Sequence, residues 1–259
     1  LIMKFGILVF PGTWSDRDCG YALESLGQQI EYVWHADTDV DRFDALVVPG
    51  GFSYGDYLRA GAIARFAPVM ESVTKFAEDG RGVIGICNGF QMLANLGLVP
   101  ATNKQYGKRE VALMWNTTAR YECRWVNLKT ESNKCIWTRN IKTLLTPVAH
   151  GEGNLYTTPE ILQNLKDNDQ LVFTYTKPDG TPANGEFPHN PNGAMEDIAA
   201  LTDPSGRILG IMPHPERFHC FTNHPDWTRI KEELKRKGEP LPEEGEGMKL
   251  FRNAVEYFA

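Results

Sequence analysis

Several features that would point away from a compact enzyme are missing from this sequence. No apolar run approaches the roughly 20 residues that a membrane-spanning helix needs. No CxxC pair occurs, and the five cysteines are an odd number, which argues against a disulfide framework and favours a reducing cytoplasm. No secretory leader is expected, because the first apolar run leads into a charged, patterned segment. We therefore expect a cytoplasmic protein without a membrane partner.

An excess of positive charge is missing as well. The chain carries 27 Lys and Arg against 33 Asp and Glu, which gives a net charge of -6. Because no basic footprint is available for a phosphate backbone, we expect no nucleic-acid partner. No GxxxxGK[ST] sequence occurs, so no ATP-binding loop is expected in this chain. With 259 residues, 42% of them apolar, the chain is long enough for a single domain with a sizeable core.

Two motifs that resemble ligand sites fail on their spacing. The run 80–85 spells GxGxxG, but its glycines enter a predicted strand instead of opening a helix, so no dinucleotide site is expected. His214, His219, Cys220 and His224 lie close together in the sequence, but their spacing matches no common structural zinc site. We therefore expect neither a metal nor a cofactor in this chain.

Short apolar runs alternate with helix-like segments over the first hundred residues. The strand-like runs are 4–10, 30–34, 45–48 and 83–86, and the helical patterns are 17–26, 66–78 and 90–96. This rhythm predicts βαβ units and an open, mostly parallel α/β sheet of flavodoxin-like type. Residues 119–156 lack helical periodicity and predict an antiparallel excursion at one edge. Beyond it we expect a helix at 159–165, strands near 171–175, 198–202 and 207–212, and a solvated, charged helix and tail within 226–247.

Cys87 is the most informative residue of the chain. It follows the apolar run 83–86, is flanked by Gly85 and Gly89, and leads straight into a helical pattern. A lone nucleophile on a glycine-flanked turn from strand to helix is the elbow by which α/β enzymes raise a reactive atom above the sheet. A buried cysteine elsewhere is usually a small apolar residue. In this setting Cys87 is predicted to be a nucleophile, and the positive end of the helix favours its thiolate.

A base and an orienting carboxylate are available far down the chain. His214 follows the last predicted strand and Glu216 lies two residues later, a set that completes a triad with the thiol. Open α/β sheets bind ligands just outside the carboxyl ends of their strands, where these residues are expected. Another strand stops at Pro49 and turns through Gly50 and Gly51, whose N–H groups are predicted to form an oxyanion hole with that of Asn88.

The motif GICNGFQ around the thiol and the distant MPHPE are similar to the class I glutamine amidotransferases, which use a Cys-His-Glu triad. Within that family, six segments resemble the glutaminase subunits of phosphoribosylformylglycinamidine synthase. They are FPGTWSDRD (10–18), VVPGGFSYGDYLRAGAIA (47–64), GVIGICNGFQML (82–93), LMWNTTARYECRW (113–125), VAHGEGNLY (148–156) and NPNGAMEDIAALTDPSGRILGIMPHPERF (190–218). The likeness spans most of the chain. One departure is Trp14-Ser15, where many members have Asn-Cys. We expect it to affect local packing only, away from the triad.

The resemblance implies that Cys87 attacks the carboxamide of L-glutamine to form a thioester, that His214 transfers protons, and that Glu216 orients the imidazole. It also implies a pocket that holds the amino-acid end of the substrate. The residues of that pocket come from the loop after the run 45–48, the helix after the thiol and a later loop: Gly50, Gly51, Phe52, Asn88, Gln91, His150, Gly151 and Glu152.

The resemblance further implies a partner. Ammonia released from glutamine would pass to a formylglycinamide ribonucleotide synthase subunit, which would bind ATP and Mg²⁺, and a small accessory subunit is also expected. The loop 190–196, with Asn192, and the excursion 119–137, with Arg120, are expected to face that partner. Two alternatives stay open: another Cys-His-Glu hydrolase of the superfamily, such as an intracellular peptidase, or a non-catalytic regulatory subunit that senses glutamine.

Overall fold

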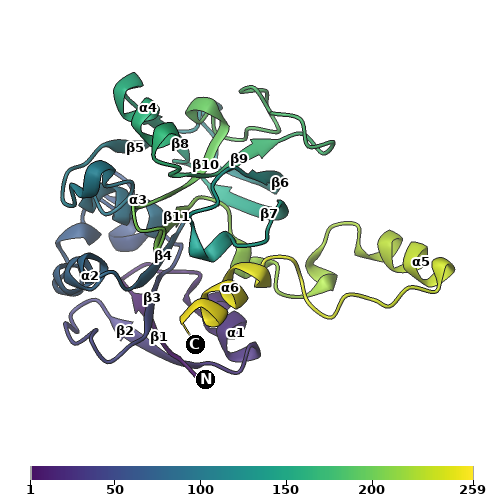
Figure 1. The fold of residues 1–259 in the computed structure, drawn as a ribbon, viewed down its shortest axis with the longest axis horizontal. Coiled ribbons are helices and arrows are strands. Elements are labelled where there is room, and N and C mark those ends of the chain that lie inside the picture. The colour runs from purple at the N-terminus through teal and green to yellow at the C-terminus, as the bar shows by residue number, and fades with distance from the viewer. Residues whose placement is uncertain (1, 259) are drawn as a thin grey trace.

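The computed structural model describes residues 2–258, which are built around a nine-stranded sheet in the order β2-β1-β3-β4-β11-β10-β9-β6-β7 (Figure 1). The neighbouring strands β2, β1, β3, β4 and β11 are parallel, and the others join them antiparallel. The parallel strands are β1 (Lys4–Val9), β2 (Gln29–Trp34), β3 (Ala45–Val48), β4 (Gly82–Ile86) and β11 (Ile208–Ile211). The antiparallel strands are β6 (Glu122–Thr130), β7 (Thr143–His150), β9 (Leu171–Thr176) and β10 (Ile198–Thr202). The predicted α/β sheet with an antiparallel edge is confirmed.

Helices cover the parallel half of the sheet. They are α1 (Asp16–Ser25), α2 (Pro68–Glu78), α3 (Asn88–Leu96) and α6 (Met248–Phe258). Helix α1 contacts β1, β2 and α6, whereas α2 and α3 both contact the short helical turn Ala64–Phe66. Every residue of β3 and β4 is buried, as expected for parallel strands covered on both faces. Helix α6 was not predicted, although its buried residues Met248, Leu250, Phe251 and Ala254 include helical spacings.

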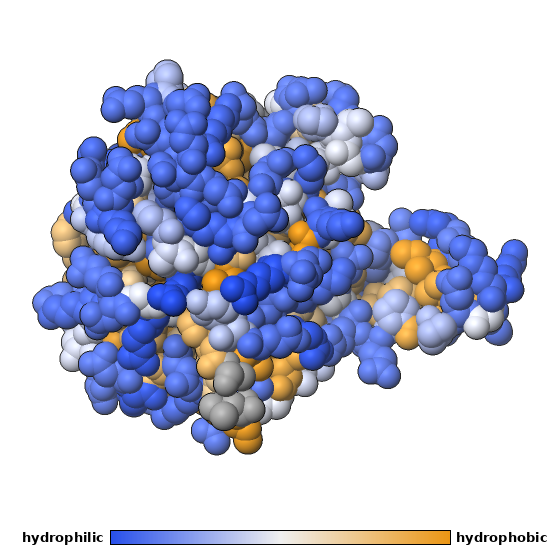
Figure 2. Space-filling view, viewed as in Figure 1, coloured by the Kyte–Doolittle hydropathy of each residue, from blue (hydrophilic) through white to orange (hydrophobic). Residues whose placement is uncertain are grey.

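Among residues 2–258, two strands and two helices lie outside the main sheet and its cover. Strands β5 (Val111–Met114) and β8 (Asn154–Thr157) form a small antiparallel sheet, and α4 (Pro159–Asp167) follows β8. Helix α5 (Trp227–Lys237) lies in the charged segment and projects from the body of the molecule (Figure 1); none of its residues is buried. Figure 2 shows a mostly hydrophilic face, with apolar atoms visible on this projecting segment as well. No helix within residues 2–258 has the length and apolar character needed to cross a membrane.

The order of the parallel strands brings the predicted chemistry together. Strands β3, β4 and β11 are direct neighbours, with Gly85 of β4 paired to Val48 on one side and to Gly210 on the other. The residues that follow these strands therefore emerge at one edge of the sheet. Cys87 extends this pairing, because its N–H donates to the carbonyl oxygen of Ile211 at 2.7 Å.

Candidate active site

Cys87 occupies a strained turn between β4 and α3. Its backbone has φ 52° and ψ −105°, a region that non-glycine residues rarely adopt, and strain of this kind is held in place by surrounding packing. Gly85 and Gly89 on either side of Cys87 let neighbouring backbone atoms approach the turn closely. A Cβ on Gly85 would lie 2.7 Å from the carbonyl oxygen of Gly89, and a Cβ on Gly89 would collide with the carbonyl oxygen of Val48. The turn therefore has the geometry of a nucleophile elbow.

His214 and Glu216 form a buried pair beside this thiol. His214 Nδ1 lies 2.5 Å from Glu216 Oε1, and the two side chains are 1% and 0% exposed. His214 Nε2 has no hydrogen-bond partner among residues 2–258. Cys87 and His214 line the same cavity of about 210 Å³, whose walls also include Trp14, Tyr121 and Arg217. The structure thus brings the three predicted triad residues together.

The charge state of His214 follows from its surroundings. Burial alone lowers the pKa of the imidazole, but the negative charges of the Glu216 carboxylate and the Cys87 thiolate outweigh burial and raise this pKa to about 10. The imidazole therefore carries a proton at neutral pH. A protonated imidazole next to a thiol stabilises the thiolate and is ready to protonate a leaving amine.

The loop after β3 and the first residue of helix α3 each supply an unpaired N–H group near the thiol. Neither the Gly51 N–H nor the Asn88 N–H has a hydrogen-bond acceptor within residues 2–258, whereas the Phe52 N–H donates to the carbonyl oxygen of Gly12 at 2.9 Å. Gly51 has φ 150°, and a Cβ there would lie 2.6 Å from the backbone nitrogen of Trp14. Two free donors beside a nucleophile are the arrangement that an oxyanion hole requires.

The side chain of Asn88 joins this loop to helix α3. Its Oδ1 accepts from the Ser53 N–H at 3.1 Å, and its Nδ2 donates to Asp56 Oδ1 at 3.1 Å and to Gln91 Oε1 at 2.9 Å. Gln91 in turn donates to the carbonyl oxygen of Glu152 at 2.7 Å. Asn88 therefore holds the loop in place from behind the cavity walls.

A second cavity, of about 310 Å³, extends from the thiol. Its lining includes most of the predicted pocket residues: Gly51, Phe52, Gln91, His150, Gly151 and Glu152. Gly50 and Asn88 lie behind these walls and line neither cavity. The predicted substrate residues thus gather around one space next to Cys87, although not all of them face it.

Sequence reasoning missed several residues of these walls. Asp56, Trp115 and Tyr121 line the larger cavity. Burial, only partly offset by the hydrogen bond from Asn88, raises the pKa of Asp56 to about 6. Asp56 lies within the run VVPGGFSYGDYLRAGAIA (47–64), so its carboxylate was a signal that the sequence offered. Trp115 and Tyr121 lie in the irregular region after β5, where no local pattern places them at the site.

Two expectations about position are wrong. Trp14 lines the cavity of Cys87 and His214, and Ser15 Oγ accepts a hydrogen bond from Arg217 Nη2 at 2.8 Å, so the Trp14-Ser15 departure lies at the triad and not away from it. Asn192 is 0% exposed, so it cannot contact a partner.

Asn192 instead supports His150 from inside the molecule. Its Nδ2 lies 3.4 Å from His150 Nε2 and donates to Tyr175 Oη at 3.1 Å. Burial, together with the charge of His214, lowers the pKa of His150 to about 3. His150 is therefore a neutral wall of the larger cavity at physiological pH.

Comparisons with known proteins agree with this geometry. Residues 3–258 match the family model described as a CobB/CobQ-like glutamine amidotransferase domain. The chain is similar to phosphoribosylformylglycinamidine synthase subunit PurQ of Moorella thermoacetica, with 48% identity over 83% of this chain and 87% of that protein. It is also similar to the subunit of that name from Methanococcus maripaludis, with 45% identity over 94% of this chain and 93% of that one. A chain of the solved structure of PurLQS from Thermotoga maritima superposes with a TM-score of 0.76 and 29% identity, covering 100% of both chains.

Proposed function

The chain belongs to the CobB/CobQ-like glutamine amidotransferase family, and on that premise we propose that it is the glutaminase subunit of phosphoribosylformylglycinamidine synthase. It hydrolyses L-glutamine to glutamate and passes the ammonia to a synthase subunit. There ATP is used to convert formylglycinamide ribonucleotide to formylglycinamidine ribonucleotide. The observation that carries this proposal is the buried pair of His214 and Glu216, whose imidazole lines the same cavity as Cys87.

The chemistry proceeds in two halves. The Cys87 thiolate attacks the side-chain carboxamide carbon of glutamine, and the Gly51 and Asn88 N–H groups stabilise the negative oxygen. The protonated His214 gives its proton to the departing nitrogen, so that ammonia leaves and a γ-glutamyl thioester remains. A water molecule then loses a proton to His214 and attacks the thioester, which releases glutamate and restores the thiolate and the imidazolium. Glu216 keeps the imidazole oriented throughout.

The larger cavity suits a free amino acid better than a peptide. Asp56 and Glu152 both line it. The Glu152 carboxylate already has a cationic partner, because its Oε2 lies 3.1 Å from Arg59 Nη2, whereas the Asp56 carboxyl group forms no ion pair within residues 2–258. A largely buried carboxylate is favourable only when a positive charge or hydrogen-bond donors reach it, and the α-ammonium group of glutamine supplies both beside Asp56. A peptidase would have to accommodate an uncharged amide at the same place.

The experiment that tests the proposal uses the reconstituted enzyme. The chain is mixed with the synthase subunit and any accessory subunit of its own organism, and formylglycinamidine ribonucleotide formation is measured with glutamine or with ammonium chloride as the nitrogen source. Cys87→Ala is expected to abolish the glutamine-dependent rate and to preserve the ammonia-dependent rate. A regulatory subunit would show no glutamine hydrolysis in the wild-type complex, and a peptidase would hydrolyse peptides faster than glutamine.

We further propose the composition of the enzyme complex, the domain organisation of this chain and its location in the cell. ATP and Mg²⁺ act in the synthase subunit, and a small accessory subunit completes the complex; the PurLQS assembly named for the structural relative supports this composition. We also propose one amidotransferase domain, supported by the family match across residues 3–258. A cytoplasmic location is supported by the five cysteines, all free thiols.

A further inference from the structure

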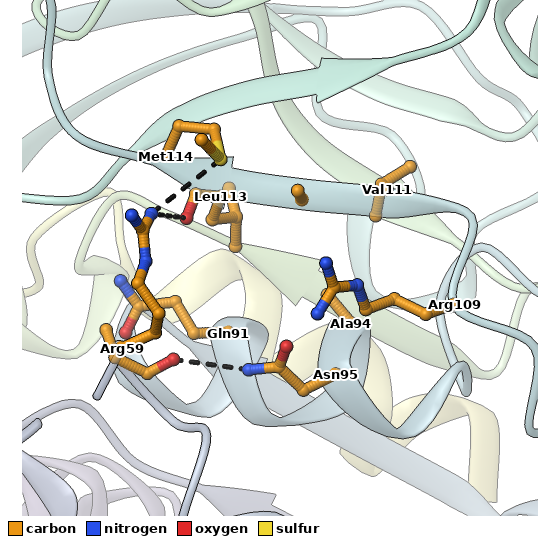
Figure 3. Close-up of a pocket in the computed structure, with 10 residues that line it drawn as sticks. Arg59, Gln91, Ala94, Asn95, Arg109, Val111, Leu113 and Met114 are labelled. Atoms are coloured by element: carbon orange, nitrogen blue, oxygen red, sulfur yellow. Dashed lines mark hydrogen bonds between the residues drawn. The ribbon is translucent and has the colours of Figure 1, made fainter. Parts of the chain in front are cut away.

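A separate cleft lies between helix α3 and strand β5, next to the glutamine cavity (Figure 3). Its volume is about 240 Å³. Ala94 and Asn95 of α3 form one side, β5 forms the other, and Arg59 and Arg109 approach from opposite ends (Figure 3). Gln91 lines both this cleft and the glutamine cavity. The proposed glutaminase chemistry does not use this space.

The lining of the cleft carries two positively charged side chains, Arg59 and Arg109. No carboxylate lines it. Within residues 2–258, Arg109 takes part in no ion pair or side-chain hydrogen bond, and it is exposed. Arg59 is already engaged, since its Nη2 lies 3.1 Å from Glu152 Oε2 and donates to the carbonyl oxygen of Leu113 at 3.4 Å. Arg109 is therefore the cation that is available to a ligand.

The other walls show what kind of anion fits. Ala94, Val111 and Leu113 make part of the cleft lining apolar, which suits the methylene groups of an acidic side chain. The guanidinium of Arg109 can bind the carboxylate of that side chain through two parallel hydrogen bonds. The cleft contains no glycine-rich loop of N–H groups of the type that binds phosphate. These features favour a carboxylate on an aliphatic stem.

The surface around the cleft has the composition of a protein interface. Met114 lines the cleft itself, and Leu58 and Trp115 line the adjoining glutamine cavity; the three are 40%, 87% and 61% exposed. Arg59 lies over the Trp115 ring, 5.9 Å from its centre. Aromatic residues, Met and Arg are enriched in interfaces, where apolar contacts surround a few charged anchors. A small free anion would have no use for this apolar surround.

We propose that the cleft of Arg59 and Arg109 receives an acidic segment of the synthase subunit, with an Asp or Glu side chain held by Arg109. This inference rests on the proposed function, because it takes the synthase as the occupant. It places one anchor of the complex directly beside the glutamine pocket, with Gln91 as the shared wall. Electrostatic anchors of this type govern partner choice and association rate as well as affinity.

The test is the affinity of the full chain for the purified synthase subunit of the same organism. Arg109→Glu is expected to raise the Kd at least tenfold and to weaken its dependence on salt, whereas Arg109→Lys, which keeps the charge but loses the two parallel hydrogen bonds, is expected to raise the Kd by a smaller factor and to keep the salt dependence. The matched control is Lys142→Glu, which makes the same change of charge at another exposed site. An Arg109→Glu Kd within twofold of wild type, or an equal loss in Lys142→Glu, would overturn the inference.

Two further outcomes separate this inference from the proposed function. If the wild-type chain does not bind the synthase at all, both fail. If it binds and supports glutamine-dependent synthesis while Arg109→Glu assembles normally, only the cleft inference fails.

Titration with citrate, followed by NMR of the arginine side chains, tests whether a small carboxylate molecule occupies the cleft instead. Saturation of Arg109 at submillimolar citrate, with unchanged synthase affinity in Arg109→Glu, would assign the cleft to a small molecule and overturn the inference.

Discussion

Gly50 lies directly against the imidazole of His214. A Cβ at position 50 would stand 2.7 Å from His214 Cε1 and 3.4 Å from the Cβ of Cys87. The glycine is therefore the spacer that lets the ends of β3, β4 and β11 close around the thiol. Gly50 itself lines neither cavity. Its role is to leave room for the imidazole of His214 beside the thiol of Cys87.

Gly50→Ala is predicted to displace the imidazole and to lower kcat/KM for glutamine by about 100-fold, because a misplacement of about 1 Å costs roughly that factor. The control is Gly180→Ala on an exposed turn outside both cavities, where no neighbouring atom would lie within 4 Å of the new Cβ. Steady-state glutaminase rates of the reconstituted complex check both variants. Equal effects of the two substitutions would show that the imidazole has room to move.

Glu216→Gln is predicted to lower the pKa of His214 from about 10, because the carboxylate is the strongest contribution that raises it. The native chain then loses its extra proton at a lower pH. NMR titration of the His214 ring signals measures this change directly. An unchanged pKa in the variant would mean that Cys87 alone holds the proton.

The same shift makes stability depend on pH. Between about pH 6.5 and pH 10 native His214 keeps a proton that the unfolded chain has lost, so its stabilising contribution is complete below pH 6.5 and disappears as the pH rises through about 10. This component has a slope of at most about 1.4 kcal/mol per pH unit. Urea unfolding between pH 7 and pH 9.5 should show a steeper alkaline loss in wild type than in Glu216→Gln. Parallel curves would contradict the assignment.

His150 is predicted to act in the opposite direction. Its pKa of about 3 means that the unfolded chain binds a proton below about pH 6.5 while the native chain does not, so the free energy of unfolding falls on acidification. His150→Gln removes this component and should flatten the decline between pH 7 and pH 5. Urea unfolding at the two pH values measures it. A decline as steep as that of wild type would show that native His150 takes up the proton.

Much of the site was predictable because strand ends and glycines carry strong local signals. The apolar run before Cys87, its flanking glycines and the strand before His214 indicate that both residues lie at the carboxyl edge of the sheet. Residues on irregular segments could not be placed in this way. Trp14, Trp115 and Tyr121 reach the cavities through tertiary folding alone, and Asn192 is buried by a loop whose polar composition suggests exposure.

In the fold, too, the elements with a local sequence pattern were predictable and those set by tertiary contacts were not. The βαβ rhythm of the first hundred residues predicts the parallel strands because burial on both faces demands continuous apolar runs. The pairing of β5 with β8 joins residues forty or more positions apart through a short register that no periodicity reveals. Helix α6 was overlooked although its apolar face is regular, since the charged segment before it resembles a tail.

Peptide mass mapping after treatment with diazo-oxo-norleucine, a glutamine mimic that alkylates a nucleophile in a glutamine site, identifies the catalytic nucleophile directly. We expect one adduct, on the buried Cys87, with protection by excess glutamine, loss of glutamine-dependent synthesis and retention of ammonia-dependent synthesis. Labelling of the exposed Cys123 instead, or labelling of Cys87 that glutamine does not prevent, would contradict it.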